Sequence, residues 1–384
     1  MPGSHPLVET QRPVWAEIDL EAIRANVRTL HELVAPAAVC AVVKADGYGH
    51  GAAECARAAI DAGAAWLAVA LVEEGVELRD AGIEAPILVL SEPVAVLADT
   101  VVARRLTPVV YSEPGIDALA DAVAAAGGDP LGVHLKVDTG MHRVGCDPAV
   151  ALDLARHVVA HDELRLTGVC THLAVADEPD NPYTDQQIEL FEAVLGLLRA
   201  RDITPGLVHA CNTAGAITAP EARYDMVRVG IGVYGIPPAP ALSDAVHLLP
   251  ALSLKARVSH VQTIAPGARV SYGLRYETEK ETRLATVPIG YADGVPRELS
   301  HHGGEVLIHG RRFPIAGTVT MDQLMVDVGD EPVEIGDEVV LLGMQVEADA
   351  GAQITAQEWA DRCDTIPYTV VCGVGPRVPR RYLP

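Results

Sequence analysis

The sequence predicts an α/β protein with an N-terminal (β/α)8 barrel of the TIM type, followed by a mainly antiparallel β domain. Eight short apolar segments alternate with helical patterns between residues 38 and 230, and continuous apolar runs are typical of strands buried on both faces. A proline-rich connector at 236–248 then precedes a series of strands. We place the barrel at 13–245 and the β domain at 246–384, and we expect residues 1–12 to pack on the β domain.

The barrel begins at residues 14–34, a short extended segment followed by a helix that Asp19 can cap. The eight predicted strands are 38–43, 66–70, 87–90, 107–111, 132–137, 166–172, 207–211 and 226–230. A further helix is expected at 184–200, where apolar residues share one face. An open doubly wound sheet is the alternative, but it usually carries GxGxxG after its first strand, and DGYGHG has a different spacing.

The β domain is predicted from the same kind of pattern without the intervening helices. Its expected strands are 251–264, 283–289, 305–308, 313–316, 318–328, 337–342 and 366–374. One short helix is expected at 355–362, beginning at Thr355.

Composition excludes several classes of function. The formal net charge of −23 and the absence of a basic run argue against a nucleic-acid partner. No apolar run reaches the ~18 residues of a membrane span, so no membrane association is expected. The seven cysteines form no CxxC pair, which predicts a cytoplasmic protein without disulfides or a zinc site. His301, His302 and Glu305 lie close together, but without a second ligand group we expect no metal there.

Lys44 is the first candidate for chemistry, because it ends an apolar strand and precedes a turn with three glycines. A desolvated lysine can form a Schiff base with an aldehyde cofactor, although a surface lysine whose ammonium reaches solvent is the alternative. The turns CNTAGA and RVGIG, after the seventh and eighth strands, are typical of phosphate binding by backbone N–H groups. An aldehyde together with a phosphate suggests pyridoxal phosphate.

Four other strand-end residues have both a functional and a structural interpretation. Lys136 could face the same cavity or form a salt bridge with Asp138 or a neighbouring carboxylate. Arg143 could bind a substrate carboxylate or lie on the surface. Arg228 is either ion-paired inside the barrel or faces a polar ligand. His172 is either a core residue or a residue of the barrel mouth. Tyrosines in turns are further candidates because aromatic residues make up only 4% of the chain.

Ten segments resemble the alanine racemase family of fold-type III pyridoxal-phosphate enzymes, and together they span nearly the whole chain. They are VWAEIDLEAIRANV, AVVKADGYGHG, KVDTGMHRVG, THLAVADE, CNTAGA, MVRVGIGVYG, RVSYGLRY, VPIGYADG, GTVTMDQLMVDV and TIPYTVVCGVGPRVPR. The resemblance implies a homodimer with shared active sites, pyridoxal 5′-phosphate as cofactor and alanine as substrate. It also implies a two-base interconversion of L- and D-alanine that supplies D-alanine for bacterial peptidoglycan.

The resemblance also implies a role for individual residues. Lys44 matches the lysine that binds the cofactor and handles the proton on the D-face, and Tyr272 matches the opposite base, donated by the partner subunit. Positions that match cofactor contacts are Tyr48, His172, Asn212, Thr213, Arg228, Gly230, Ile231 and Tyr368. Arg143 and the backbone of Met321 match contacts to the substrate carboxylate and a cofactor oxygen, Lys136 matches a lysine that is often carbamylated, and Tyr291 and Asp322 match substrate-entry positions. Two departures are Thr213, where serine is common, and Thr320, where cysteine is frequent.

The chemistry of racemisation is consistent with these residues. The α-proton must leave one face and return to the other, which needs two bases on opposite sides, each with a pKa near the working pH. Free tyrosine titrates at about 10, so Tyr272 needs a nearby cation, and Arg143 is the candidate. The alternatives are a racemase for serine or lysine, an amino-acid decarboxylase of the same fold type, and a non-catalytic pyridoxal-phosphate-binding protein. The last is typically a single barrel, unlike this chain.

Overall fold

The computed structural model describes residues 12–347 and 350–384, which form two compact units. The barrel unit is Leu20–Leu249, and the β unit combines residues 12–19 with Pro250–Pro384. The sequence predicts the boundaries at 13–245 and 246–384. The difference arises because β1 (Val14–Asp19) pairs antiparallel with β10 (Leu252–Arg257) and parallel with β20 (Arg380–Leu383). The predicted packing of residues 1–12 falls, apart from Arg12, outside the described residues.

Eight parallel strands form the barrel, which confirms the predicted fold class. They are β2 (Ala38–Val42), β3 (Trp66–Val69), β4 (Ile87–Val89), β5 (Thr107–Val110), β6 (Leu131–Lys136), β7 (Leu164–Cys170), β8 (Leu207–His209) and β9 (Met226–Val229). The pairing order is β8-β7-β6-β5-β4-β3-β2-β9. Backbone hydrogen bonds from Asp225 N to Val208 O (3.1 Å) and from Arg228 N to Cys211 O (2.9 Å) join the two ends of this order. The side chains inside the barrel are therefore enclosed by a nearly continuous wall of strands.

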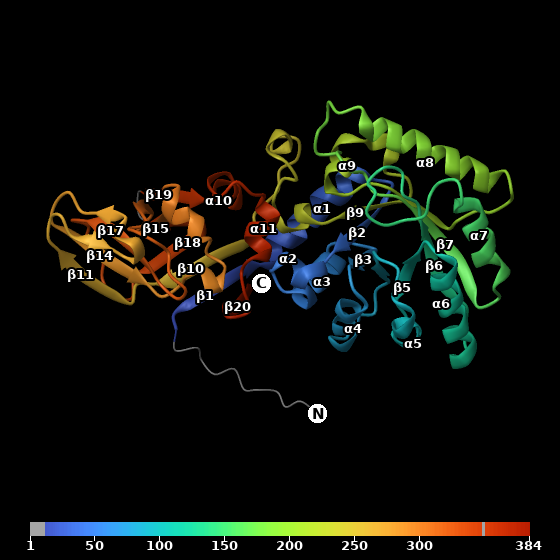
Figure 1. Ribbon diagram of the computed structural model, residues 1–384, viewed down its shortest axis with the longest axis horizontal. Helices are drawn as coiled ribbons and strands as arrows, with labels where there is room; N and C mark the ends of the chain where they lie inside the picture. The colour runs from blue at the N-terminus through green and yellow to red at the C-terminus, as the bar shows by residue number, and fades with distance from the viewer. Residues whose placement is uncertain (1–11, 348–349) are drawn as a thin grey trace. The chain divides into compact units, whose positions relative to one another are not determined.

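Helices surround the strands of the barrel unit (Figure 1). They are α1 (Leu20–Val34), α3 (Ala52–Asp61), α4 (Val72–Asp80), α5 (Ala98–Ala103), α6 (Glu113–Ala126), α7 (Ala151–Ala160), α8 (Tyr183–Arg199) and α9 (Thr213–Thr218). The predicted helix at 184–200 is confirmed, and its apolar face is buried through Phe191, Leu195 and Leu198. No helix within the described ranges is both long and apolar enough to cross a membrane.

The β unit contains two main sheets, which confirms the predicted second domain. The larger sheet has the order β16-β15-β18-β10-β1-β20, and the smaller sheet has the order β11-β14-β17. Its remaining elements are β11 (His260–Ile264), β12 (Arg269–Val270), β13 (Tyr276–Glu277), β14 (Thr282–Val287), β15 (Glu305–Ile308), β16 (Arg311–Pro314), β17 (Leu324–Gly329), β18 (Glu338–Glu347), β19 (Ala350–Ile354), α10 (Ala356–Arg362) and α11 (Pro367–Cys372).

Three expectations for the β unit were wrong in detail. The segment predicted as a strand at 366–374 contains the helix α11. Pro367 occupies its first turn, where proline is favoured, and Pro367, Val370 and Val371 are buried together on one face of the helix. The strand predicted at 251–264 is two strands, because the chain leaves one sheet after β10 and enters the other at β11. Only β17 forms within the segment predicted at 318–328, since residues 318–323 are an irregular loop.

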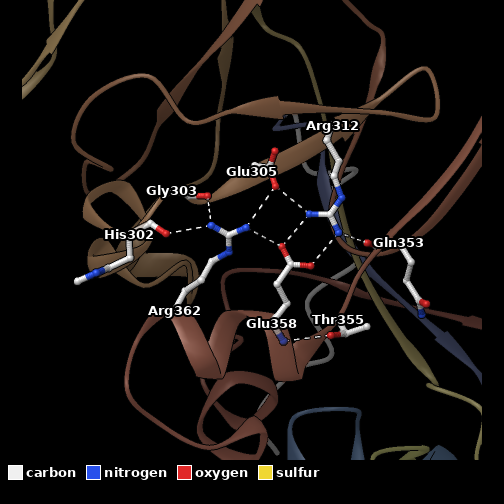
Figure 2. Close-up of polar contacts among 8 residues, drawn as sticks. All are labelled: His302, Gly303, Glu305, Arg312, Gln353, Thr355, Glu358 and Arg362. Carbon is white, nitrogen blue, oxygen red and sulfur yellow. Dashed lines mark hydrogen bonds and ion pairs between the residues drawn. The ribbon is translucent and has the colours of Figure 1, made fainter.

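Four charged side chains attach α10 to the neighbouring strands of the β unit (Figure 2). The guanidinium of Arg312 binds both carboxylate oxygens of Glu358 at 2.8 Å and also contacts Glu305 at 2.8 Å. Arg362 contacts the same two carboxylates at 3.1 and 3.3 Å. The helix predicted at 355–362 is confirmed, and Thr355 caps it by accepting a hydrogen bond from Glu358 N at 3.0 Å. The hydrogen bond with Arg312 is the main reason that the pKa of Glu358 lies below its ordinary value.

We expect Glu358→Gln to loosen α10 at neutral pH. A bidentate pair within a network is worth about 1 kcal/mol, so amide exchange in α10 should become about fivefold faster. Because the folded pKa is lowered, the stabilisation is present above the unfolded pKa of about 4.3 and is lost as the pH falls through the folded value. Hydrogen–deuterium exchange measures the effect, with Asp330→Asn, which affects an exposed ion pair, as control. Equal exchange in α10 of both variants would contradict the prediction.

Candidate active site

Lys44 begins a turn of unusual backbone conformation at the end of β2. The next four residues, Ala45, Asp46, Gly47 and Tyr48, have φ values of 52°, 50°, 60° and 53°, so the turn is left-handed. Each L-residue other than glycine in this conformation costs roughly 1–2 kcal/mol. Such strain persists only where the surroundings enforce it, and it is concentrated at functional sites.

Two carboxylates hold this turn in place. Ala45 N donates to Glu74 Oε1 at 2.6 Å, and Ala52 N donates to Asp46 Oδ1 at 2.9 Å. Glu74, in α4, also accepts hydrogen bonds from Ala70 N and Leu71 N, which follow β3. The position of Lys44 is therefore fixed from a neighbouring strand end as well as from its own.

Tyr48, Thr213 and Gly230 come together at the carboxyl ends of β2, β8 and β9. Gly230 N donates to Thr213 Oγ1 at 2.9 Å. A Cβ atom at Gly230 would lie 2.4 Å from the hydroxyl oxygen of Tyr48, so only glycine fits there. Asn212 caps α9 by accepting a hydrogen bond from Gly215 N at 2.9 Å, and Ile231 is buried directly after Gly230. The predicted glycine-rich turns thus place hydroxyl groups and backbone amides at one end of the barrel.

Arg228 is buried in β9, and carbonyl oxygens and histidines hold its guanidinium. Its Nη2 donates to Thr171 O and Ala210 O, both at 2.8 Å, and contacts His172 Nδ1 at 3.2 Å. Its Nη1 donates to His209 Nδ1 at 2.7 Å. Of the two interpretations of Arg228, these contacts favour polar neighbours over an ion pair inside the barrel.

His209 and one further histidine, His134, continue this network into the barrel. Since arginine can only donate, His209 accepts at Nδ1 and donates from Nε2 to His134 Nδ1, at 2.9 Å. The pKa values of His209 and His172 lie well below the ordinary value for histidine. Burial is the main cause, and the positive charge of Arg228 is the second. The same causes lower the pKa of His134 to about 4. All three rings are therefore neutral at physiological pH.

Lys136, Arg143 and His172 line one small pocket at the ends of β6 and β7. Lys136 is buried, and its Nζ donates to Leu90 O at 3.2 Å. Burial is the largest cause that lowers the pKa of Lys136 to about 8, and the nearby cations Arg228, Arg143 and Lys44 contribute to the same shift. The alternative salt bridge with Asp138 does not fit, because Asp138 binds Gly140 N, His142 N and the ring of His142.

Tyr272 lies in the β unit on a turn that hydrogen bonds with Thr318 hold in place. Its side chain is 73% exposed. Ser271, at φ 64°, donates from Oγ to Thr318 O at 2.6 Å, and Thr318 Oγ1 donates to Tyr272 O at 2.8 Å. The turn therefore presents the exposed tyrosine ring on a backbone that is fixed by hydrogen bonds.

Met321, Tyr291 and Asp322 form a second group in the β unit. Tyr291 N donates to Thr320 O at 3.0 Å, and Ala292 N donates to Met321 O at 3.1 Å. Tyr291 and Met321 are both exposed, and Asp322 pairs with Arg377 at 2.6 Å. Tyr368 lies in α11, half-buried.

The structure also identifies residues that sequence reasoning missed. Glu74 supports the turn after Lys44, and His209 and His134 support Arg228. A histidine within each of two apolar strands, GVHLKV and LVHAC, was an available signal. Glu74 carried none, because its partners lie in the turns after β2 and β3.

Comparison with known proteins agrees with this arrangement. Residues 18–238 match the model of the alanine racemase N-terminal domain, and residues 251–382 match that of the C-terminal domain. An alanine racemase from Symbiobacterium thermophilum is 50% identical over 379 residues, 98% of each chain. The crystal structure of alanine racemase from D-cycloserine-producing Streptomyces lavendulae has a TM-score of 0.91 at 41% identity, with 98% of each chain covered.

A protein named for another substrate has the same architecture. A histidine racemase from Leuconostoc mesenteroides has a TM-score of 0.88 at 31% identity, covering 98% of this chain and 99% of its own. Fold similarity alone therefore does not identify the amino acid that is racemised. The two alanine racemase family models, in contrast, match the sequences of both units. The chain belongs to the alanine racemase family, isomerases that interconvert L- and D-alanine with pyridoxal 5′-phosphate.

Proposed function

We propose that this chain interconverts L- and D-alanine with pyridoxal 5′-phosphate, using Lys44 and Tyr272 as its two proton-transferring groups. The observation that carries the proposal is the cluster at the ends of β2, β8 and β9. There Lys44 and the hydroxyl group of Tyr48 flank a strained, well-supported turn, beside the hydroxyl group of Thr213 and a glycine at which a Cβ would clash.

The barrel residues fit the cofactor by their chemistry. Tyr48, Thr213 and the backbone at Gly230 and Ile231 supply hydroxyl and amide donors suited to a phosphate, with Asn212 shaping the turn. Lys44 is the amine that would hold the aldehyde carbon, and Tyr368 is a further hydroxyl for the phosphate. When bound, pyridoxal phosphate makes the α-hydrogen of an amino acid acidic by withdrawing electrons from the α-carbon.

Lys44 and Tyr272 then divide the proton transfer. Lys44 Nζ takes and returns the α-proton on the D-face, and Tyr272 Oη does so on the L-face. Arg143 and the backbone of Met321 orient the substrate carboxylate and a cofactor oxygen, while Tyr291 and Asp322 line the entrance. Lys44 belongs to the barrel unit and Tyr272 to the β unit. Following the family resemblance, we propose that two copies share their sites, each Tyr272 serving the Lys44 of the partner subunit.

Arg228 controls the electronic environment of the site. It would face the ring nitrogen of the cofactor as a permanent donor, with His172 beside it. The neutral His209 accepts from Arg228 and cannot supply a proton at neutral pH. With arginine as its partner, the ring nitrogen would stay unprotonated, which would disfavour side reactions such as transamination.

Lys136 has the properties of a carbamylation site. Its pKa of about 8 leaves part of the amine neutral at physiological pH, and a neutral amine can add carbon dioxide. The resulting carboxylate would hold Arg143, which lines the same pocket.

The free cysteines support a cytoplasmic location for the enzyme.

A turnover assay with several amino acids tests the proposed substrate. The kcat/KM for L- and D-alanine should exceed that for serine, lysine and histidine by at least about tenfold, because each additional buried group costs 1–3 kcal/mol in a pocket that does not accommodate it. Chiral chromatography of the products measures both directions. A preference for any of the other amino acids would overturn the assignment of alanine and leave a racemase of different specificity.

A further inference from the structure

Two histidines and one carboxylate converge on the outer surface of the barrel unit, away from the residues described above. His157 lies in the last turn of α7 and His161 directly follows that helix, so the two are one helical turn apart. Asp117 lies in α6, 40 residues before His157. Because no local sequence motif joins the three, only the packing of α6 beside α7 brings them together.

Both imidazole rings contact the same oxygen atom. Asp117 Oδ1 lies 2.6 Å from His157 Nε2 and 3.3 Å from His161 Nε2. All three ligand atoms lie within 4.8 Å of one another. The hydrogen bond from His157 lowers the pKa of Asp117, so the carboxylate is anionic at neutral pH.

These distances are close to those of a metal centre. Two ligands bound at about 2.0–2.1 Å in tetrahedral geometry lie about 3.3 Å apart. The Asp117–His161 separation already has this value, and the Asp117–His157 separation needs to lengthen by less than 1 Å. The side chains are 51%, 32% and 28% exposed for Asp117, His157 and His161, so an ion can enter from solvent and water can complete the coordination.

The donor set indicates the class of ion. Two imidazole nitrogens and one carboxylate oxygen suit zinc and its neighbours among the first-row transition metals, whereas magnesium and calcium prefer oxygen ligands alone. Each ring would bind through Nε2 and carry its proton on Nδ1. Without the ion, the same atoms form an ordinary hydrogen-bonded cluster, which is the competing explanation.

We propose that Asp117, His157 and His161 form a transition-metal site, with Zn²⁺ as its ion, that joins α6 to α7. The ion cross-links two barrel helices separated in the chain by β6 and the segment 137–150. Because it binds only the folded arrangement, it stabilises the barrel unit without entering the racemase reaction.

Equilibrium dialysis of the untagged holoenzyme against Zn²⁺ tests the site. The unsubstituted chain should bind one more Zn²⁺ per chain than Asp117→Asn or His157→Gln, whose affinity should fall more than tenfold, since even outer-shell changes cost about 10–100-fold. Added Zn²⁺ should raise the unfolding temperature of the unsubstituted chain and not that of the variants. Racemase activity without added metal should be equal in all of them.

Asp153→Asn and His31→Gln are matched controls, since both residues are exposed and outside the cluster. They should bind Zn²⁺ like the unsubstituted chain. With Co²⁺ as probe, the visible absorption of a tetrahedral site should appear in the controls and be lost in the two variants. Equal Zn²⁺ binding by the unsubstituted chain and Asp117→Asn, or equal loss in the controls, would overturn the proposal.

Discussion

Lys44→Ala should abolish racemisation in both directions. This one change removes the amine that would bind the cofactor and the base for the D-face, so activity should fall by about 10⁴-fold or more. The visible absorbance of the protein-bound cofactor should disappear at the same time. Chiral chromatography of the alanine product and an absorbance spectrum of the purified protein measure the two effects.

Lys280→Ala is the matched control for this variant. Lys280 is exposed, pairs with Asp330 at 3.2 Å and is another of the four lysines of the chain. Its removal should leave both activity and absorbance unchanged. If Lys44→Ala kept its absorbance and its activity, Lys44 would have no role in the chemistry and the proposed function would fail.

Tyr272→Phe should lose activity asymmetrically with respect to the two enantiomers. The change removes only the hydroxyl, and loss of one general acid–base group costs about 10²–10⁴-fold. Exchange of the α-proton of L-alanine with deuterated solvent should fall much more than that of D-alanine, which would still depend on Lys44. Proton NMR in D2O measures both rates, and Tyr382→Phe, in β20, is the control. Equal losses for the two enantiomers would reject the two-base assignment.

Mixing the two inactive variants tests whether the sites are shared. Random pairing of Lys44→Ala with Tyr272→Phe chains makes half of the dimers mixed, and each mixed dimer would contain one intact site. Activity should therefore recover to about a quarter of the unsubstituted value. If subunits exchange and no activity returns, each site is built from a single chain.

The barrel was predictable because the amino-acid composition of its strands alone indicates that they are buried. β2, β3 and β4 are continuous apolar runs, and all their residues are buried except Ala38 and Trp66, which begin β2 and β3. The helix α11 was not predictable in this way, since Thr369, Val370 and Val371 favour a strand locally. The burial of Pro367, Val370 and Val371 on one face of a helix decides otherwise.

The supporting residues of the site show a second limit of sequence reasoning. Lys44 and Arg228 were found because a charge stands out in an apolar strand. His209 was missed because its function depends on Arg228, 19 residues away, and on His134, 75 residues away. Left-handed backbone at Ala45 and Asp46 was also hidden, because neither residue type favours it strongly enough to signal it.

The anchoring of Arg228 limits how this barrel can evolve toward other reactions. A protonated ring nitrogen would require an acidic side chain at position 228 in place of the guanidinium. Such a residue would leave Thr171 O and Ala210 O without their donor, and each buried acceptor left unpaired costs about 1–3 kcal/mol. It would also bring a negative charge toward two carbonyl dipoles. A descendant with different reaction chemistry would therefore need coordinated changes at the ends of β7, β8 and β9, which makes the route by single substitutions unfavourable.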